Sequence, residues 1–146
     1  MGVAVGALVG CFGLALTVGL AHGSSQGQLG PIATMATSPG LPQFLWVISA
    51  LVLAPPIEEL LFRGVLYGGY RKSFGAVIAG LLTTMIFCVL HLQELIYVLP
   101  AAFGIIGVAL AALWFRLRFA AIGPAIAVHF AYNAVVVCFA IGVTRV

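Results

Sequence analysis

The chain has 146 residues, of which 64% are hydrophobic and only 6% are charged. Soluble domains carry about 25% charged residues, so this composition excludes an ordinary soluble domain and predicts a membrane protein. The net charge of +3 is too small to indicate a nucleic-acid partner, and Cys11, Cys88 and Cys138 match no metal or redox spacing.

About five apolar stretches are long enough to cross a bilayer, which takes roughly 20 residues of α-helix. We therefore predict an all-α, polytopic transmembrane helical bundle of about five spans embedded in the lipid bilayer. In chain order the expected spans are Val3–Ala21, Phe44–Tyr67, Gly75–Leu92, Leu95–Phe115 and Ala120–Val143.

The first stretch, Val3–Ala21, is rich in Gly and Ala, which suits close helix packing in lipid. A cleaved signal peptide is the competing interpretation, but the positively charged region that precedes such a peptide is missing, so we expect a retained helix. The segment from His22 to Gln43 is uncharged and rich in Gly, Ser and Pro, which predicts a loop outside the hydrocarbon. We therefore divide the chain into residues 1–43 and a membrane domain of residues 44–146.

Pro55 and Pro56 fall near the middle of the second expected span. Prolines inside a helix remove backbone hydrogen bonds and bend it. In membranes such breaks survive where neighbouring groups or a cavity satisfy the freed carbonyls. We therefore expect the second span to be bent at this point.

Basic residues flank the expected spans unevenly. Threading the spans through a bilayer places a single basic residue, Arg145, on one side. The other side carries four, which are Arg71, Lys72, Arg116 and Arg118. The positive-inside rule then places the N-terminus and these basic loops in the cytoplasm.

Six polar residues lie inside the apolar stretches, where an ionisable side chain costs about 2.5–3.5 kcal/mol on insertion scales. They fall on three different spans, and their convergence by chance is improbable. This predicts a polar cavity inside the membrane, formed by Glu58, Glu59, Arg63, His91, His129 and Asn133.

The first group of polar residues is Glu58, Glu59 and Arg63. Residues four apart meet on one face of a helix, whereas adjacent residues point about 100° apart. The simplest arrangement pairs Arg63 with Glu59 and turns Glu58 into the interior, where a carboxylate serves as a general base. A structural ion-pair cluster and a proton path are the competing interpretations.

The second group is Phe87 and His91, which share a helix face because they are four residues apart. The ring either shapes a pocket or packs above the imidazole. If the third helix begins at Gly75, His91 lies about 24 Å along it, whereas Glu58 lies only about 14 Å from the cytoplasmic end of its helix. This difference in depth predicts either tilted helices or a segment Gly75–Gly80 that is partly re-entrant.

The third group is His129 and Asn133, again four residues apart. An imidazole and a carboxamide on one face can donate hydrogen bonds to a developing negative oxygen. The competing interpretation is a polar clamp between helices. We expect His22, in the polar loop, to play no part, and Glu94 either orients the imidazole of His91 or is solvated at the end of its span.

Together the three groups resemble the CAAX prenyl endopeptidase and bacteriocin-processing family of membrane proteases. The motif E-E-x-x-x-R begins at Glu58, F-x-x-x-H at Phe87 and H-x-x-x-N at His129. The resemblance covers about Leu45–Val137. It implies an intramembrane endopeptidase that hydrolyses a peptide bond of a membrane-associated protein or peptide, with an active site open towards the cytoplasm.

Carried over motif by motif, the resemblance implies that Glu58 and His91 activate the attacking water. It also implies that His129 and Asn133 form an oxyanion hole. Glu59 and Arg63 would support the site as an ion pair, and Phe87 would support it with its ring. We expect no metal, because the H-E-x-x-H pattern is absent. A zinc ion is the alternative, since two imidazoles and a carboxylate supply three ligands and leave a position for water. Its ligands would be Glu58, His91 and His129.

Two other functions compete with proteolysis. A proton-coupled transporter uses intramembrane carboxylates and broken helices in a similar way, although the internal repeats typical of transporters are not evident. A non-catalytic scaffold or bacteriocin-immunity protein would keep the motifs without cleaving. The richness in Gly, Ala and Val and the small size favour a protein of a prokaryotic cell membrane, and the small size also favours a homodimer.

Overall fold

The computed structural model of the protein describes residues 1–21, 35–36, 38–93 and 99–143. These residues form helices and connecting turns, with no strand among them, which confirms the predicted all-α membrane bundle. Two of the helical segments, η1 and η2, are π-helical. In chain order the elements are α1 (Gly2–Ala21), α3 (Leu41–Ile48), η1 (Ser49–Leu53), α4 (Ala54–Glu59), η2 (Leu60–Leu66), α5 (Tyr67–Leu90), α7 (Leu99–Phe119) and α8 (Gly123–Val143).

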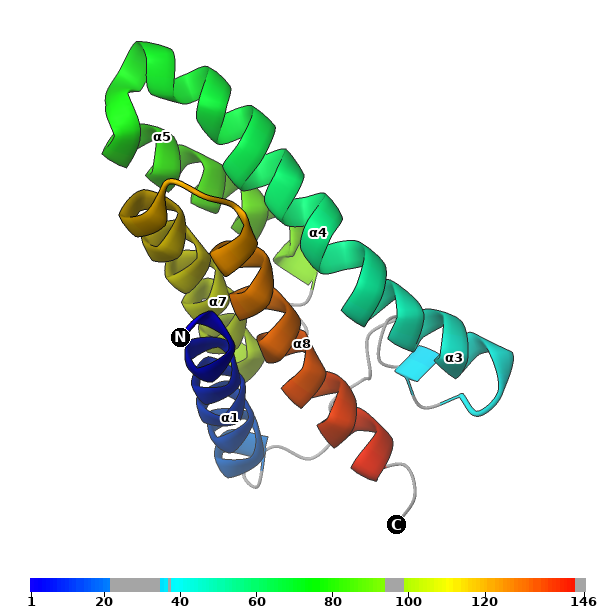
Figure 1. Ribbon diagram of the computed structural model, residues 1–146. Helices are drawn as coiled ribbons and strands as arrows, with labels where there is room; N and C mark the ends of the chain where they lie inside the picture. Colours follow the sequence, from blue (N-terminus) through cyan, green and yellow to red (C-terminus); the bar gives the residue numbers. More distant parts are fainter. Residues whose placement is uncertain (22–34, 37, 94–98, 144–146) are drawn as a thin grey trace.

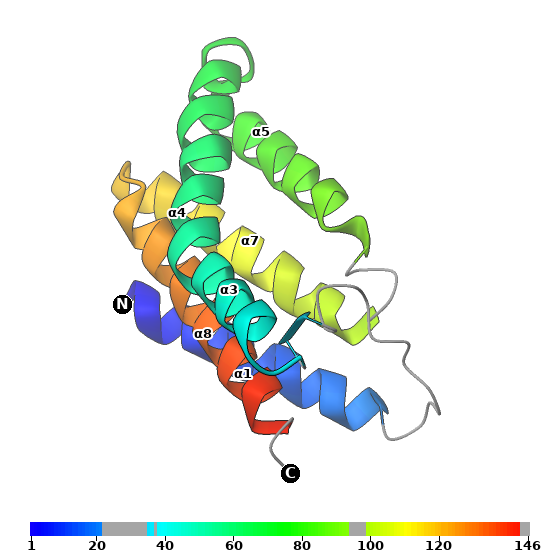
Figure 2. The ribbon, with the colours of Figure 1, turned by 90° about the vertical axis from the view of Figure 1, so that its right-hand side faces the viewer.

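The dominant feature is a helical hairpin. The elements α3, η1, α4, η2 and the first part of α5 run end to end as one long helix that stops at Gly75 (Figure 1). Gly75 has φ 76° and ψ 172°, a conformation that is strained for every residue except glycine. The rest of α5 then turns back beside the long helix (Figure 2), and the rings of Phe62 and Phe87 pack edge to face between the arms, 5.2 Å apart.

This hairpin removes the difference in depth between Glu58 and His91. The sequence predicted that the second helix ends at Tyr67, but it continues to the turn at Gly75. At 1.5 Å per residue, Glu58 then lies about 25 Å and His91 about 24 Å from that turn, one on each arm. The expectation of a partly re-entrant segment is therefore wrong, since Gly75 alone departs from helical geometry in α5.

Three described helical stretches are long and apolar enough to cross a membrane, and a shorter apolar helix covers Gly2–Leu16. The first of the three includes the turn at Gly75, so it supplies both arms of the hairpin. The number of spans stays a prediction, as does the division at residue 43, because most of the expected polar loop lies outside the described residues. The three stretches are Leu41–Leu90, Ala102–Phe119 and Gly123–Gly142.

Helix α1 packs closely against α7 and α8 because glycines lie at the contacts. A Cβ atom on Gly6 would meet the backbone carbonyl of Val128. A Cβ atom on Gly13 would lie 3.1 Å from the Cα of Gly104 in α7. Small residues that let helix backbones approach in this way are the usual basis of helix packing in lipid. Helix α1 is therefore packed directly against both α7 and α8.

Candidate active site

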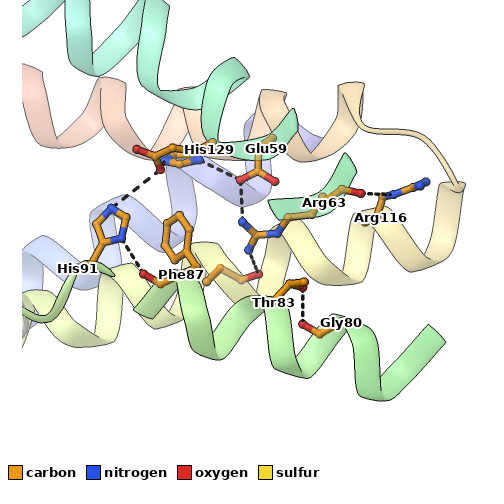
Figure 3. Close-up of polar contacts among 10 residues, drawn as sticks. Glu59, Arg63, Gly80, Thr83, Phe87, His91, Arg116 and His129 are labelled. Atoms are coloured by element: carbon orange, nitrogen blue, oxygen red, sulfur yellow. Dashed lines mark hydrogen bonds and ion pairs between the residues drawn. The ribbon is translucent and has the colours of Figure 1, made fainter. Parts of the chain in front are cut away.

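Five of the six polar residues expected to converge do meet, between the long helix, the end of α5 and α8 (Figure 3). Their burial differs from one end of the group to the other. Glu59 and Arg63 are 1% exposed and His129 is 4% exposed, whereas the side chains of His91 and Glu58 are 26% and 25% exposed. The group therefore has a closed side and a side that a substrate can approach.

The closed side is built on Arg63. Its Nη1 donates to Oε1 of Glu59 at 3.1 Å, the pairing that the spacing of four predicts. Its Nη2 donates to the backbone carbonyl of Ala109 in α7 at 2.8 Å. The guanidinium carbon lies 5.0 Å from the ring centroid of Phe87, within the range of a cation–π contact. Arg63 thereby fixes the Glu59 carboxylate in a position where water has little access.

Glu59 in turn orients His129. The Nδ1 atom of His129 lies 3.0 Å from the same Oε1 that accepts from Arg63. A carboxylate paired with arginine only accepts hydrogen bonds, so Nδ1 carries the hydrogen. The other ring nitrogen, Nε2, faces the second glutamate, 3.7 Å from Oε2 of Glu58.

His91 is oriented by its own helix. It caps the end of α5 with φ −98° and ψ 18°, and its Nδ1 lies 2.9 Å from the backbone carbonyl of Phe87. A carbonyl also only accepts, so this Nδ1 carries a hydrogen as well. The imidazole stacks on the Phe87 ring, with centroids 4.2 Å apart and planes at 25°. Nε2 is left facing Oε2 of Glu58 at 3.9 Å.

His91 and His129 therefore each direct their Nε2 atom at the same carboxylate oxygen, Oε2 of Glu58. Oε2 of Glu58 is buried and has no hydrogen-bond partner among the described residues. The two nitrogens lie too far from it for direct hydrogen bonds, which extend to about 3.2 Å. Spacing in the sequence predicted that Glu58 faces the interior, but it did not show that both histidines would face one oxygen of its carboxylate.

Asn133 lies one turn after His129 on α8, but its contact is with the long helix. Its Nδ2 donates to the backbone carbonyl of Ala50 in η1 at 2.8 Å. Sequence reasoning missed Ala50 as a partner. The signal that pointed to it is Pro55, which removes a backbone donor from the helix that contains Ala50.

One further contact was not expected. Arg116, near the end of α7, donates from Nε to the backbone carbonyl of Arg63 at 2.9 Å, and its guanidinium carbon lies 5.1 Å from the ring centroid of Tyr67. From the sequence, the charge of Arg116 indicated only the orientation of the spans. His22 and Glu94 lie outside the described residues.

The donor atoms do not assemble at the distances of a zinc site. Ligands at about 2.0–2.1 Å from a tetrahedral zinc lie roughly 3.3–3.4 Å from one another. Oε2 of Glu58 is 3.7 Å from Nε2 of His129 and 3.9 Å from Nε2 of His91. Within the part of the chain that the structure describes, no group of three or more His, Cys, Asp or Glu side chains is placed to hold a metal ion.

A carboxylate and two imidazoles thus face one another inside an apolar helical bundle, and side chains of these kinds can act in general acid–base catalysis. Residues 39–135, about two thirds of the chain, match the family described as type II CAAX prenyl endopeptidase, Rce1-like. The chain belongs to this family of membrane proteases, and the family implies a membrane-associated protein as substrate. Comparison with curated proteins and with solved structures finds no match.

Proposed function

We propose that this protein is an intramembrane endopeptidase that hydrolyses a peptide bond of a membrane-associated protein or peptide. The observation that supports it best is the convergence of Nε2 of His91 and Nε2 of His129 on Oε2 of Glu58, at 3.9 and 3.7 Å. Two atoms that both bind one water at about 2.8 Å have this separation when the angle at the water is about 85°. Glu58 and His91 can thus hold the attacking water between them, with Nε2 of His129 beside it.

In this proposal Glu58 is the general base. It accepts a proton from the water while the water oxygen bonds to the scissile carbonyl carbon. When the carbon–nitrogen bond breaks, the same proton passes to the departing amine. His91 holds the water from the partly exposed side, with its ring fixed by the carbonyl and the ring of Phe87. A positioned base of this kind contributes about 10²–10⁴-fold to a rate.

We propose that His129 and Asn133 stabilise the oxyanion of the tetrahedral intermediate. Because Glu59 accepts the hydrogen of Nδ1, His129 donates to the oxyanion from Nε2 once that nitrogen also carries a proton. The amide of Asn133 has two hydrogens, and its bond to Ala50 uses one of them. Arg63 supports the site through Glu59, because it holds the carboxylate that orients His129.

We propose that the reaction needs no metal. The support is the spacing of the donor atoms of Glu58, His91 and His129, which is wider than a zinc site requires. The test is the rate after exhaustive chelation, with bound zinc measured in the same sample. A rate that falls with the zinc content and returns when zinc is added would favour the zinc alternative.

We also propose that the end of the bundle with the turn at Gly75 faces the cytoplasm of a prokaryotic cell and that the protein functions as a homodimer. Support for the orientation comes from the basic residues. Arg71 and Lys72 are exposed beside the turn at Gly75, and Arg118 is exposed near the end of α7. The turn at Gly75 and the turn between α7 and α8 lie at the same end of the bundle (Figure 1). The small size of the bundle supports the dimer.

The function is tested with purified protein in liposomes and three reporter peptides. One carries a farnesylated C-terminus, the second is the same peptide without the lipid, and the third is an apolar membrane peptide. In water enriched in ¹⁸O, wild type should give a product with one ¹⁸O in its new carboxylate, and His91→Ala should give little or none. The peptide that is cleaved identifies the substrate class. Proton flux across the vesicles without any cleavage would instead support a transporter.

A further inference from the structure

The hydrogen bond between Asn133 and Ala50 joins two helices that carry different parts of the site. Nδ2 of Asn133, in α8, lies 2.8 Å from the carbonyl oxygen of Ala50, in η1. Helix α4, which carries Glu58, follows directly after η1, and His129 precedes Asn133 by one turn on α8. The bond therefore links the segment before the catalytic carboxylate to the helix of the histidine that faces it.

The Ala50 carbonyl needs this partner because of Pro55. In the π-helical turn, the N–H of Ala54 donates to the carbonyl of Ser49, five residues earlier. The same pattern would pair the carbonyl of Ala50 with the N–H of residue 55, and proline has none. Within lipid no water is present to replace the missing donor, so a carbonyl left without one is costly. The carboxamide of Asn133 takes the place of the missing backbone N–H.

We propose that Asn133 is a positioning residue, which holds the proline-broken helix against α8 and thereby sets the distance between Glu58 and His129. Pro55 is fully buried at the break, so the direction of α4 depends on how the preceding turn is anchored. The catalytic consequence rests on the proposed proteolysis, whereas the anchoring of the helix does not. The second hydrogen of the amide remains for the oxyanion.

The test is a cycle of four proteins: wild type, Asn133→Ala, Pro55→Ala and the double variant. Pro55→Ala returns a backbone N–H to the helix, so the carbonyl of Ala50 no longer depends on Asn133. Val135→Ala is the matched control, because Val135 lies on α8 near Gly10 of α1 and contributes packing there. All proteins carry spin labels at two exposed positions on α3 and α8, in a background from which the native cysteines are removed. The labelled positions are Phe44 and Phe139, and the replaced cysteines are Cys11, Cys88 and Cys138.

Pulsed electron paramagnetic resonance then measures the distance between the labels. We expect Asn133→Ala to broaden the distance distribution, the double variant to match Pro55→Ala, and Val135→Ala to leave the distribution unchanged. A packing role for Asn133 would not be rescued by a hydrogen on residue 55. An unchanged distribution in Asn133→Ala, or the same broadening with and without Pro55, would overturn the proposal, and neither result depends on cleavage.

The cleavage rate gives the catalytic consequence. A single hydrogen bond of ordinary strength corresponds to about tenfold, so Asn133→Ala should lower kcat about tenfold more in the wild-type background than in the Pro55→Ala background. In the Pro55→Ala background only the contribution of Asn133 to the oxyanion should be lost, about 10²–10³-fold. Equal losses in both backgrounds, with an unchanged distance distribution, would assign Asn133 to the oxyanion alone and reject the positioning role, while the proposed proteolysis would stand.

Discussion

Replacing Arg63 by methionine removes the charge that compensates Glu59 while keeping a side chain of similar length. Arg63 gives up its bonds to Oε1 of Glu59 and to the carbonyl of Ala109. The Glu59 carboxylate, 1% exposed, then keeps only His129 as a donor. Breaking a buried ion pair by removing one partner costs about 3–5 kcal/mol, because it leaves an uncompensated buried charge. We expect the free energy of unfolding of Arg63→Met to fall by this amount.

The double variant Arg63→Met, Glu59→Gln separates this cost from the loss of packing. Neither remaining side chain is charged, so the penalty reduces to unsatisfied polar groups, about 1–3 kcal/mol. Each single variant should cost about 3–5 kcal/mol, so the double variant should be less destabilised than the sum of the two by at least about 3 kcal/mol. Arg118→Met, at an exposed position near the end of α7, is the control and should change stability by no more than about 0.5 kcal/mol.

The assay is unfolding in mixed micelles with increasing fractions of sodium dodecyl sulfate, followed by the fluorescence of Trp46 and Trp114. A cost below about 1 kcal/mol for Arg63→Met would refute the reasoning, because a buried and uncompensated carboxylate cannot be that inexpensive. Costs of Arg63→Met and Glu59→Gln that add to within about 0.5 kcal/mol would refute it equally, since independent sites add in this way.

Three further predictions concern the glycines and the aromatic ring. Gly6→Ala places a methyl group against a backbone carbonyl of α8 and should destabilise the protein by about 1–3 kcal/mol in the same unfolding assay; Gly142→Ala, where nothing lies within 4 Å, should be neutral or slightly stabilising. Gly75→Ala should cost about 1–3 kcal/mol because φ is 76° there, whereas Gly69→Ala, inside the helix with open space around it, should stabilise by about 0.5–1 kcal/mol; equal effects would contradict the strained turn. Phe87→Leu removes the ring stacked on an imidazole and should lower the cleavage rate by more than it lowers stability, and an unchanged rate would show that the stacking is dispensable.

The sequence was sufficient to predict which polar residues share a helix face, because spacing on a helix is a local property. The pairing of Glu59 with Arg63 depends only on a separation of four residues. The placement of Phe87 and His91 on one face depends on the same geometry. Burial of charge in apolar stretches was equally visible, since its cost does not depend on the details of the fold.

The ends of the helices were harder to predict. The second span was expected to end at Tyr67, and glycines and basic residues follow it in the sequence. Hydropathy indicates where a helix contacts lipid, and a helix that leaves the bilayer continues without that signal. The helix ends at Gly75 because of the backbone conformation of that residue. Gly68 and Gly69 are also glycines, but the chain makes no turn at either of them, so residue type alone does not locate the turn.

Partners of backbone atoms could not be predicted either. The contacts of Arg63 with Ala109 and of Asn133 with Ala50 join residues that are distant in the chain. Their acceptors are carbonyl groups, which every residue possesses, so the residue type carries no information. The shift into π-helical turns on both sides of α4 was likewise not evident from residue types.

The most direct test of the central claim is the cleavage rate of Glu58→Gln, measured on a substrate that the wild type cleaves and at matched stability. Glutamine keeps the shape of the side chain but cannot accept the proton of the water. If Glu58 is the general base, kcat should fall by about 10²–10⁴-fold while the unfolding transition stays close to that of the wild type. A rate within about tenfold of the wild type would contradict the account, because the water would then be activated by another group.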